Sequence, residues 1–236
     1  MNWDDYAVAL FDLDGVVTPT AEVHMRAWDR MFNEFLDGRP DQTPYTDDDY
    51  FAHVDGKPRY EGVATFLASR GIELPQGDPG DAPEAETVCG LGNRKNDAFN
   101  RVLAEDGVEA YPGSARLIEE LERRGVPMAV VSSSRNAPAV LEAAGLTASF
   151  RMVMDGAVAA ERGLPGKPAP DTFLAAAEEL GATPAQAVVL EDAISGVRAG
   201  AAGGFGLVVG VDRGAGHDAL VDAGAHVVVK DLEELL

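Results

Sequence analysis

The stretch Tyr6-Ala-Val-Ala-Leu-Phe-Asp12 is an apolar run of strand length that ends in a cluster of aspartate and glycine residues. A continuous apolar run of this length is typical of a strand that is buried on both faces of a parallel sheet. Three further runs share the pattern, and helix-period stretches separate them. The runs are 127–132, 187–191 and 205–210, the helical stretches are 114–124, 136–145 and 171–181, and 226–229 is a candidate edge strand.

This alternation of strands and helices predicts an α/β fold, with right-handed crossovers and a doubly wound parallel sheet. The 236 residues amount to roughly 1.6 average domains. The pattern changes between residues 20 and 103, where no buried-strand run occurs and 23–36, 59–69 and 95–103 have the periodicity of amphipathic helices. We therefore predict an α/β core domain formed by 1–19 and 104–236, with an inserted α-helical domain over 20–103. Inside the insertion, 74–83 is rich in turn formers and acidic residues, which predicts an exposed loop.

The composition limits the possible partners. Forty acidic residues face nineteen basic ones, for a formal charge of −21, and the basic residues form no block. We expect no nucleic-acid partner and no anionic membrane surface as a partner. No apolar run approaches the roughly 20 residues that cross a bilayer, the first residues lack the pattern of a signal peptide, and the single cysteine, Cys89, has no internal disulfide partner. These features predict a cytoplasmic protein.

Ligands of open α/β sheets bind at the carboxyl ends of the strands, so the residues that follow each strand are the first candidates for chemistry. Asp12 and Asp14 follow the first run, and alternation along a strand would point their side chains the same way. Two converging carboxylates are costly unless a cation or a shared proton relieves them, and Mg²⁺ prefers such oxygen ligands. The alternative is that both residues only shape a turn before Gly15.

Three other junctions carry polar groups. Ser132 begins a hydroxyl-rich segment that leads into a helix and is either a phosphate seat or an ordinary cap. Lys167 lies in the segment Gly166-Lys167-Pro168, just before a predicted helix, and is either a catalytic cation or a solvated side chain. Glu191 and Asp192 form a second acidic pair or a helix cap. Together these groups are the inventory needed for Mg²⁺-assisted phosphoryl transfer.

In this order, the segment Asp12-x-Asp14-Gly-Val, then Ser132, Lys167 and Glu191-Asp192 resemble the four motifs of the haloacid dehalogenase superfamily of phosphotransferases. The likeness spans nearly the whole chain. It implies that Asp12 is the nucleophile that becomes an aspartyl phosphate and that Asp14 is the general acid and base. It also implies that Ser132 and Lys167 hold the phosphate. Mg²⁺ would be bound by Asp12, the backbone carbonyl of Asp14, Glu191 and Asp192.

The insertion resembles the helical cap of the subgroup that contains β-phosphoglucomutase. The stretches 20–28, 54–59 and 94–96 carry this likeness in the insertion, and 134–136 carries it in the core. The substrate-binding residues that it implies are Thr20, His24, Trp28, Gly56, Arg59, Lys95, Asn96, Ser134, Arg135 and Asn136. From the residues alone, His24 could instead be a packing residue and Arg59 a solvated one.

The resemblance implies a Mg²⁺-dependent phosphohexomutase that interconverts β-D-glucose 1-phosphate and D-glucose 6-phosphate through an aspartyl phosphate and a hexose bisphosphate. Such an intermediate presents each phosphate in turn to one aspartate. A second, cationic site must therefore bind the phosphate that is not reacting, and Arg59 and Arg135 are the candidates for it. One alternative is a phosphatase acting on a small sugar phosphate. Another is a catalytically silent binding module of the same fold, which the complete catalytic set disfavours. The expected partner is a phosphorylated hexose, and a monomer is expected.

Overall fold

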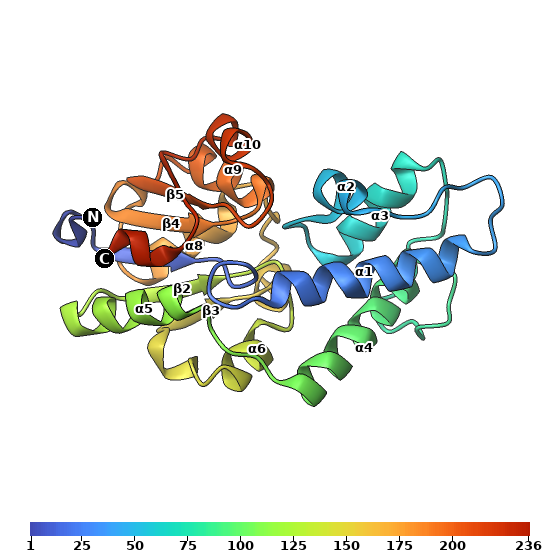
Figure 1. Ribbon diagram of the computed structural model, residues 1–236, viewed down its shortest axis with the longest axis horizontal. Helices are drawn as coiled ribbons and strands as arrows, with labels where there is room; N and C mark the ends of the chain where they lie inside the picture. Colours follow the sequence, from blue (N-terminus) through green and yellow to red (C-terminus); the bar gives the residue numbers. More distant parts are fainter. The chain divides into compact units, whose positions relative to one another are not determined.

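The computed structural model describes residues 1–236, apart from the side chain of Asp106, and it divides into two compact units (Figure 1). The first unit is Met1–Thr20 with Val108–Leu236, and the second is Ala21–Gly107. The sequence places the corresponding divisions at 19/20 and 103/104, and the structure has them at 20/21 and 107/108. The second division lies later in the structure because helix α4 continues to Asp106.

The first unit contains one six-stranded sheet, in the order β3-β2-β1-β4-β5-β6, and every strand pair is parallel. The strand order reverses at β1, from which the chain adds strands first on one side and then on the other. This topology confirms the predicted doubly wound α/β fold. The strands are β1 Val8–Phe11, β2 Met128–Val131, β3 Met152–Met154, β4 Ala187–Glu191, β5 Leu207–Val211 and β6 Val227–Val229.

Helices of the first unit pack against this sheet. Helix α8 contacts β1, β2 and β3, and α9 contacts β4 and β5. The fully buried Phe173 of α8 and Val197 of α9 belong to one apolar cluster with Leu10 and Val189 of the sheet. The helices are α5 Pro112–Arg124, α6 Ala137–Ala143, α7 Gly156–Glu161, α8 Asp171–Glu179, α9 Ile194–Ala202 and α10 His217–Ala223, with short 3₁₀ turns at Trp3–Asp5, Thr147–Ser149, Pro184–Gln186 and Leu232–Leu235.

The second unit is helical, as the sequence predicts. An aromatic cluster forms its core, with the ring centroids of Phe32 and Phe66 4.1 Å apart and those of Trp28 and Phe32 5.3 Å apart. Helix α4 begins seven residues before the predicted stretch, because the hydroxyl of Thr87 caps it by accepting a hydrogen bond from the Gly90 amide at 2.9 Å. The helices are α1 Thr20–Leu36, α2 Asp47–Asp49, a π-helical turn Tyr50–Val54, α3 Arg59–Ser69 and α4 Val88–Asp106.

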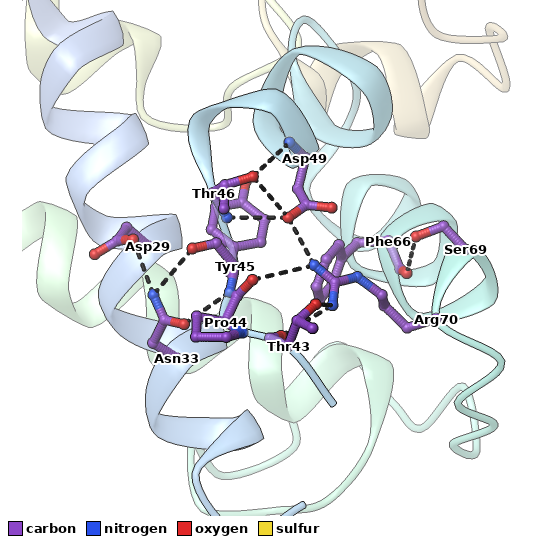
Figure 2. Close-up of polar contacts among 10 residues, drawn as sticks. All are labelled: Asp29, Asn33, Thr43, Pro44, Tyr45, Thr46, Asp49, Phe66, Ser69 and Arg70. Atoms are coloured by element: carbon purple, nitrogen blue, oxygen red, sulfur yellow. Dashed lines mark hydrogen bonds and ion pairs between the residues drawn. The ribbon is translucent and has the colours of Figure 1, made fainter. Parts of the chain in front are cut away.

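Arg70, at the end of α3, joins that helix to the segment that precedes α2 (Figure 2). Its guanidinium donates hydrogen bonds to the carbonyl of Thr43 at 2.9 Å and to that of Pro44 at 3.3 Å. It also forms an ion pair with Asp49 at 2.7 Å and lies over the ring of Phe66, 5.1 Å from its centroid. Burial alone would raise the pKa of Asp49, but hydrogen bonds from Arg70 and Thr46 lower it below its ordinary value.

No helix among residues 1–236 as described combines the length and the apolar character that a bilayer crossing needs.

We predict that Arg70→Met lowers the stability of the helical unit by about 1 kcal/mol, because the partly buried carboxylate of Asp49 and the exposed carbonyls of Thr43 and Pro44 lose a charged donor. Urea unfolding is followed by the fluorescence of Trp28 in a Trp3→Phe background, since these are the two tryptophans of the chain. The exposed pair Arg30–Glu34 supplies the control Arg30→Met, for which little change is expected.

This loss should depend on pH in one direction. Because the pKa of Asp49 is lower in the folded chain than its ordinary value of 3.8, the ion pair contributes fully above that pH and is lost as the pH falls through the folded pKa. The difference between wild type and Arg70→Met should therefore shrink on acidification. A difference that stays constant down to about pH 3 would show that Asp49 is not the partner that matters.

Candidate active site

The candidate site lies where β1, β2 and β4 end side by side. Phe11 of β1 is in register with Val130 of β2 and with Leu190 of β4. The next residue, Asp12, continues the pairing, because its amide donates to the Leu190 carbonyl at 2.9 Å. This register brings the Asp12 side chain level with the carboxyl ends of both neighbouring strands, at the point where the strand order reverses.

Lys167, which the chain supplies shortly before α8, holds these strand ends together. Its ammonium donates to Oδ1 of Asp12 at 2.5 Å, to Oε1 of Glu191 at 2.6 Å and to the carbonyl of Val131 at 2.9 Å. Lys167, Asp12 and Glu191 are 2%, 7% and 0% exposed, so the group is closed to bulk water. The second oxygen of Glu191 accepts from the Ala193 amide at 2.8 Å. All three ammonium protons therefore have acceptors, and Glu191 is fixed at both oxygens.

The electrostatics of this group favour an additional cation. Burial raises the pKa of Asp12 well above its ordinary value; Lys167 opposes that effect, and the charges of Glu191 and Asp14 add to it. Burial alone would lower the pKa of Lys167, but Asp12 and Glu191 raise it, so the ammonium stays protonated. One ammonium does not balance three carboxylates, and the unmet negative charge is the setting in which a divalent cation binds oxygen ligands.

The second acidic pair reaches the loop that follows β1. Gly15 has a φ of +82°, and a Cβ atom at that position would lie 1.8 Å from Oδ2 of Asp192. The carboxylate of Asp192 therefore rests against the backbone next to Asp14. Among the described residues, no three His, Cys, Asp or Glu side chains form a preassembled metal site. The oxygen donors that fit Mg²⁺ are carboxylates of Asp12 and Asp192 with the backbone carbonyl of Asp14, while both Glu191 oxygens already accept hydrogen bonds.

Asp14 is placed by a turn rather than by a strand. Because β1 ends at Phe11, Asp14 lies beyond the strand on which the argument from alternation relied. Oδ1 of Asp14 instead accepts a short hydrogen bond from the hydroxyl of Thr20, which in turn lies 2.8 Å from the hydroxyl of Thr18. Both threonines are buried. Sequence analysis missed Thr18, although a polar residue so close to an acidic pair was a usable signal.

Ser132 lies at the end of β2, next to the Val131 carbonyl that Lys167 contacts. Its hydroxyl accepts from the Ser134 amide at 3.1 Å, and the Ser134 hydroxyl accepts from the Asn136 amide at 3.1 Å. These bonds fold the segment into a turn, while Arg135 on the same turn is exposed. Of the predicted phosphate-holding residues, the structure thus places Ser132 near Lys167 and leaves Ser134 and Asn136 in the supporting turn.

In the helical unit, two predicted residues and one that was not predicted surround the buried ammonium of Lys95. Lys95 is 4% exposed, and its Nζ is in close contact with Nδ1 of His24. It lies 4.9 Å from the ring centroid of Trp28 and 5.2 Å from that of Phe99, on which His24 stacks at 4.0 Å. Phe99 is a residue that sequence analysis missed, and its position one helical turn after Lys95 was the available signal. The structure therefore brings His24, Trp28 and Lys95 together.

Arg59 is held rather than loosely solvated. It donates to the side-chain oxygen of Asn96 at 2.6 Å and to that of Asn93 at 3.5 Å. Asn93 was not predicted; its Oδ1 also accepts from the Tyr60 hydroxyl at 2.9 Å. Gly56, with a φ of +68°, forms the turn before α3 that delivers Arg59. Arg59 and Asn96 thus form a second polar group in the helical unit, beside Lys95 on α4.

Comparison with known proteins agrees with this arrangement. Residues 6–204 match the family described as haloacid dehalogenase-like hydrolase. The chain is 49% identical over 236 residues to a β-phosphoglucomutase of Mycobacterium tuberculosis, covering 96% of this chain and 90% of that protein. It is 31% identical to the validoxylamine A 7'-phosphate phosphatase of Streptomyces hygroscopicus, covering 98% and 96%. The crystal structure of a β-phosphoglucomutase from Clostridium difficile, at 23% identity, has the same fold, with a TM-score of 0.79 over 98% of this chain and 93% of that one.

The chain therefore belongs to the haloacid dehalogenase-like hydrolase family, within its β-phosphoglucomutase-like subgroup. This confirms the family that the order of the motifs predicted.

We predict that Gly15→Ala lowers the turnover number at least about 100-fold, because the new methyl group displaces the Asp192 carboxylate from the loop after β1. The matched control is Gly181→Ala. Gly181 has a φ of +78°, but a Cβ there meets nothing within 4 Å, so this variant bears the same backbone strain without the clash. Turnover and thermal unfolding are measured for both variants. Equal activity losses would mean that backbone strain, and not the position of Asp192, is responsible.

Proposed function

We propose that the chain is a Mg²⁺-dependent phosphohexomutase that interconverts β-D-glucose 1-phosphate and D-glucose 6-phosphate. The observation that carries the proposal is the buried group of Asp12, Lys167 and Glu191, with Asp192 against the same loop. The 49% identity to a β-phosphoglucomutase, over most of both chains, supports the same reading. A phosphosugar substrate follows from that relationship, and the hexose and its anomer are part of the proposal.

Asp12 is the nucleophile in this scheme. Its Oδ1 is held by Lys167, and we assign Oδ2 to the attack on phosphorus, which forms the acyl phosphate bond as the bond to the sugar oxygen breaks. The hydroxyl of Ser132 binds a phosphoryl oxygen, and the ammonium of Lys167 exchanges one of its three present acceptors for another phosphoryl oxygen when the substrate binds. When bound by Asp12, Asp192 and the Asp14 carbonyl, Mg²⁺ supplies the positive charge that lets an anionic carboxylate approach an anionic phosphoryl group.

Asp14 is the general acid and base in this scheme. The leaving sugar oxygen needs a proton as the phosphorus–oxygen bond breaks, and the carboxyl of Asp14 donates it. In the second half-reaction the same group, now a carboxylate, takes the proton from the hydroxyl of the sugar that attacks the aspartyl phosphate. The hydrogen bond from Thr20 to Oδ1 orients the Asp14 carboxyl, and we assign this proton transfer to that carboxyl.

The helical unit, predicted from the sequence as residues 20–103, is proposed to act as a cap that supplies the second phosphate seat. A hexose bisphosphate must hold one phosphate away from Asp12 while the other reacts, and a guanidinium binds such a group in a bidentate manner. Arg59, oriented by Asn96, is the candidate in this unit. Thr20, Gly56, Lys95 and His24 are proposed to shape the sugar-binding surface, together with Ser134, Arg135 and Asn136 of the core.

We further propose that the protein acts in the cytoplasm as a monomer, without a nucleic-acid or membrane partner. The net charge of −21 supports the absence of polyanionic partners.

A phosphatase acting on a small sugar phosphate is the second candidate, and the phosphatase relative at 31% identity favours it. It would use the same core residues, with water in place of the sugar hydroxyl as the group that attacks the aspartyl phosphate. The two functions differ in how completely water is excluded from Asp12 after the first step.

The product decides between them. With β-glucose 1-phosphate, Mg²⁺ and a trace of the hexose bisphosphate, we expect glucose 6-phosphate and little orthophosphate. Asp12→Asn should abolish both products while the protein stays folded, because asparagine keeps the size of the side chain and removes the nucleophile. Rapid orthophosphate without the isomer would replace the mutase proposal with the phosphatase one. Unchanged turnover in Asp12→Asn would overturn both.

We predict that Arg59→Ala lowers the mutase reaction about 10- to 100-fold but changes the hydrolysis of a simple aryl phosphate by less than about threefold, since an aryl phosphate has no second phosphate to seat. Isomer formation and aryl release are measured on the same preparations. Arg30→Ala, at an exposed ion pair of the same unit, is the control for general effects of removing an arginine. Equal losses on both substrates would reduce Arg59 to a structural residue of the cap.

A further inference from the structure

Arg213, in the loop that follows β5, reaches the backbone of the catalytic loop. Its Nε donates to the carbonyl of Gly15 at 2.9 Å, and its NH1 donates to the carbonyl of Lys230 at 2.9 Å. The guanidinium carbon lies 3.8 Å from the ring centroid of Tyr111, and a guanidinium nitrogen lies 3.8 Å from a carboxylate oxygen of Asp231. All of these residues belong to the first unit. One side chain thus joins three distant segments of that unit.

The carbonyl that Arg213 holds belongs to the residue after Asp14. The amide of Gly15 donates to the carbonyl of Thr18 at 2.8 Å, so both peptide groups that flank Gly15 are fixed. One of these two peptide groups contains the carbonyl of Asp14. The bond to Thr18 holds the peptide group that contains the Asp14 carbonyl, and the bond from Arg213, 198 residues away in the sequence, holds the peptide group that follows it.

The next two carbonyls of the loop are held in a similar way. The hydroxyl of Ser114 donates to the Val16 carbonyl at 2.6 Å, and the amide of Tyr111 donates to the Val17 carbonyl at 3.0 Å. Tyr111 also carries the ring on which Arg213 stacks. Three consecutive carbonyls are thus bound by groups from outside the loop. Arg213 is the only one of these three donors that reaches its carbonyl through a long side chain, so its planar geometry sets where the loop can lie.

We propose that Arg213 is a positioning residue, which aims the Asp14 carboxyl at the sugar oxygen by fixing the Gly15 carbonyl. The inference rests on the proposed role of Asp14 as general acid and base. A guanidinium suits this task, because its fork donates to two carbonyls while its face lies on an aromatic ring, and a lysine cannot do all three. A shift of about 1 Å in such a group costs roughly 100-fold in rate.

A misplaced general acid has a distinctive kinetic effect. The oxygen of a sugar is a poor leaving group and needs the proton from Asp14, whereas 4-nitrophenolate leaves without one. Loss of the position of Asp14 should therefore slow phosphorylation of Asp12 by the sugar phosphate and leave phosphorylation by 4-nitrophenyl phosphate nearly unchanged. A general loosening of the fold would slow both.

The test compares Arg213→Gln and Arg213→Lys with Asp14→Asn as the benchmark, and with Arg116→Gln as the matched control. Arg116 pairs with Glu233 near the same C-terminal segment and is half exposed. The full-length proteins are mixed with Mg²⁺ and either β-glucose 1-phosphate or 4-nitrophenyl phosphate in single-turnover experiments, and thermal unfolding is recorded for each. We expect both Arg213 variants to slow the sugar reaction about 10- to 100-fold and the aryl reaction less than about threefold.

Each outcome has one meaning. If Asp14→Asn shows the selective loss and the Arg213 variants do not, Arg213 has no positioning role and the proposed function stands. If Asp14→Asn shows no selective loss, the assigned role of Asp14 fails, and the inference fails with it. Full activity in Arg213→Lys would show that only the positive charge matters, which also overturns the inference. If Arg213→Gln does not fold, Arg213→Lys carries the test.

Discussion

The first unit is organised around one buried ammonium. Burying two carboxylates away from water costs free energy, and the ammonium of Lys167 offsets that cost because it contacts Asp12 and Glu191 directly. It donates its third proton to the Val131 carbonyl. The three acceptors belong to the ends of β1, β4 and β2. The interaction that aligns the centre of the sheet is therefore also the one that orients Asp12, the proposed nucleophile, so the stability of this region is coupled to its proposed chemistry.

A parallel sheet makes that alignment possible. Because β1 pairs in register with β2 on one side and with β4 on the other, the residues that follow all three strands come level at one edge. The strand order also reverses at β1, which is the point at which open α/β sheets bind their ligands. The order of the motifs along the chain, which looks scattered in the sequence, is simply the order in which a doubly wound sheet visits that edge.

Much of this could be predicted from sequence, and the remainder has identifiable physical reasons. Long apolar runs predicted β1, β2, β4 and β5, whereas β3 was missed because Met152–Met154 is short and only partly buried. Asp12, Lys167 and Glu191 were each recognisable as candidates, but only tertiary structure joins them. Arg213 could not have been found, since a bond to a backbone carbonyl leaves no pattern of residue types. The start of α4 was missed because a threonine cap, rather than apolar periodicity, sets it.

The first unit thus fixes the residues of the candidate site by two separate means. Side chains are held by a buried charge network centred on Lys167, and the loop after β1 is held through three of its backbone carbonyls. This division suits phosphoryl transfer, in which the protein contributes mainly position and charge. In the proposed mechanism the charge network must change as phosphate arrives and departs, because it includes Asp12, the proposed nucleophile. The backbone contacts would involve no reacting atom, so they could keep Asp14 in place while the charge around Asp12 changes through each proposed half-reaction.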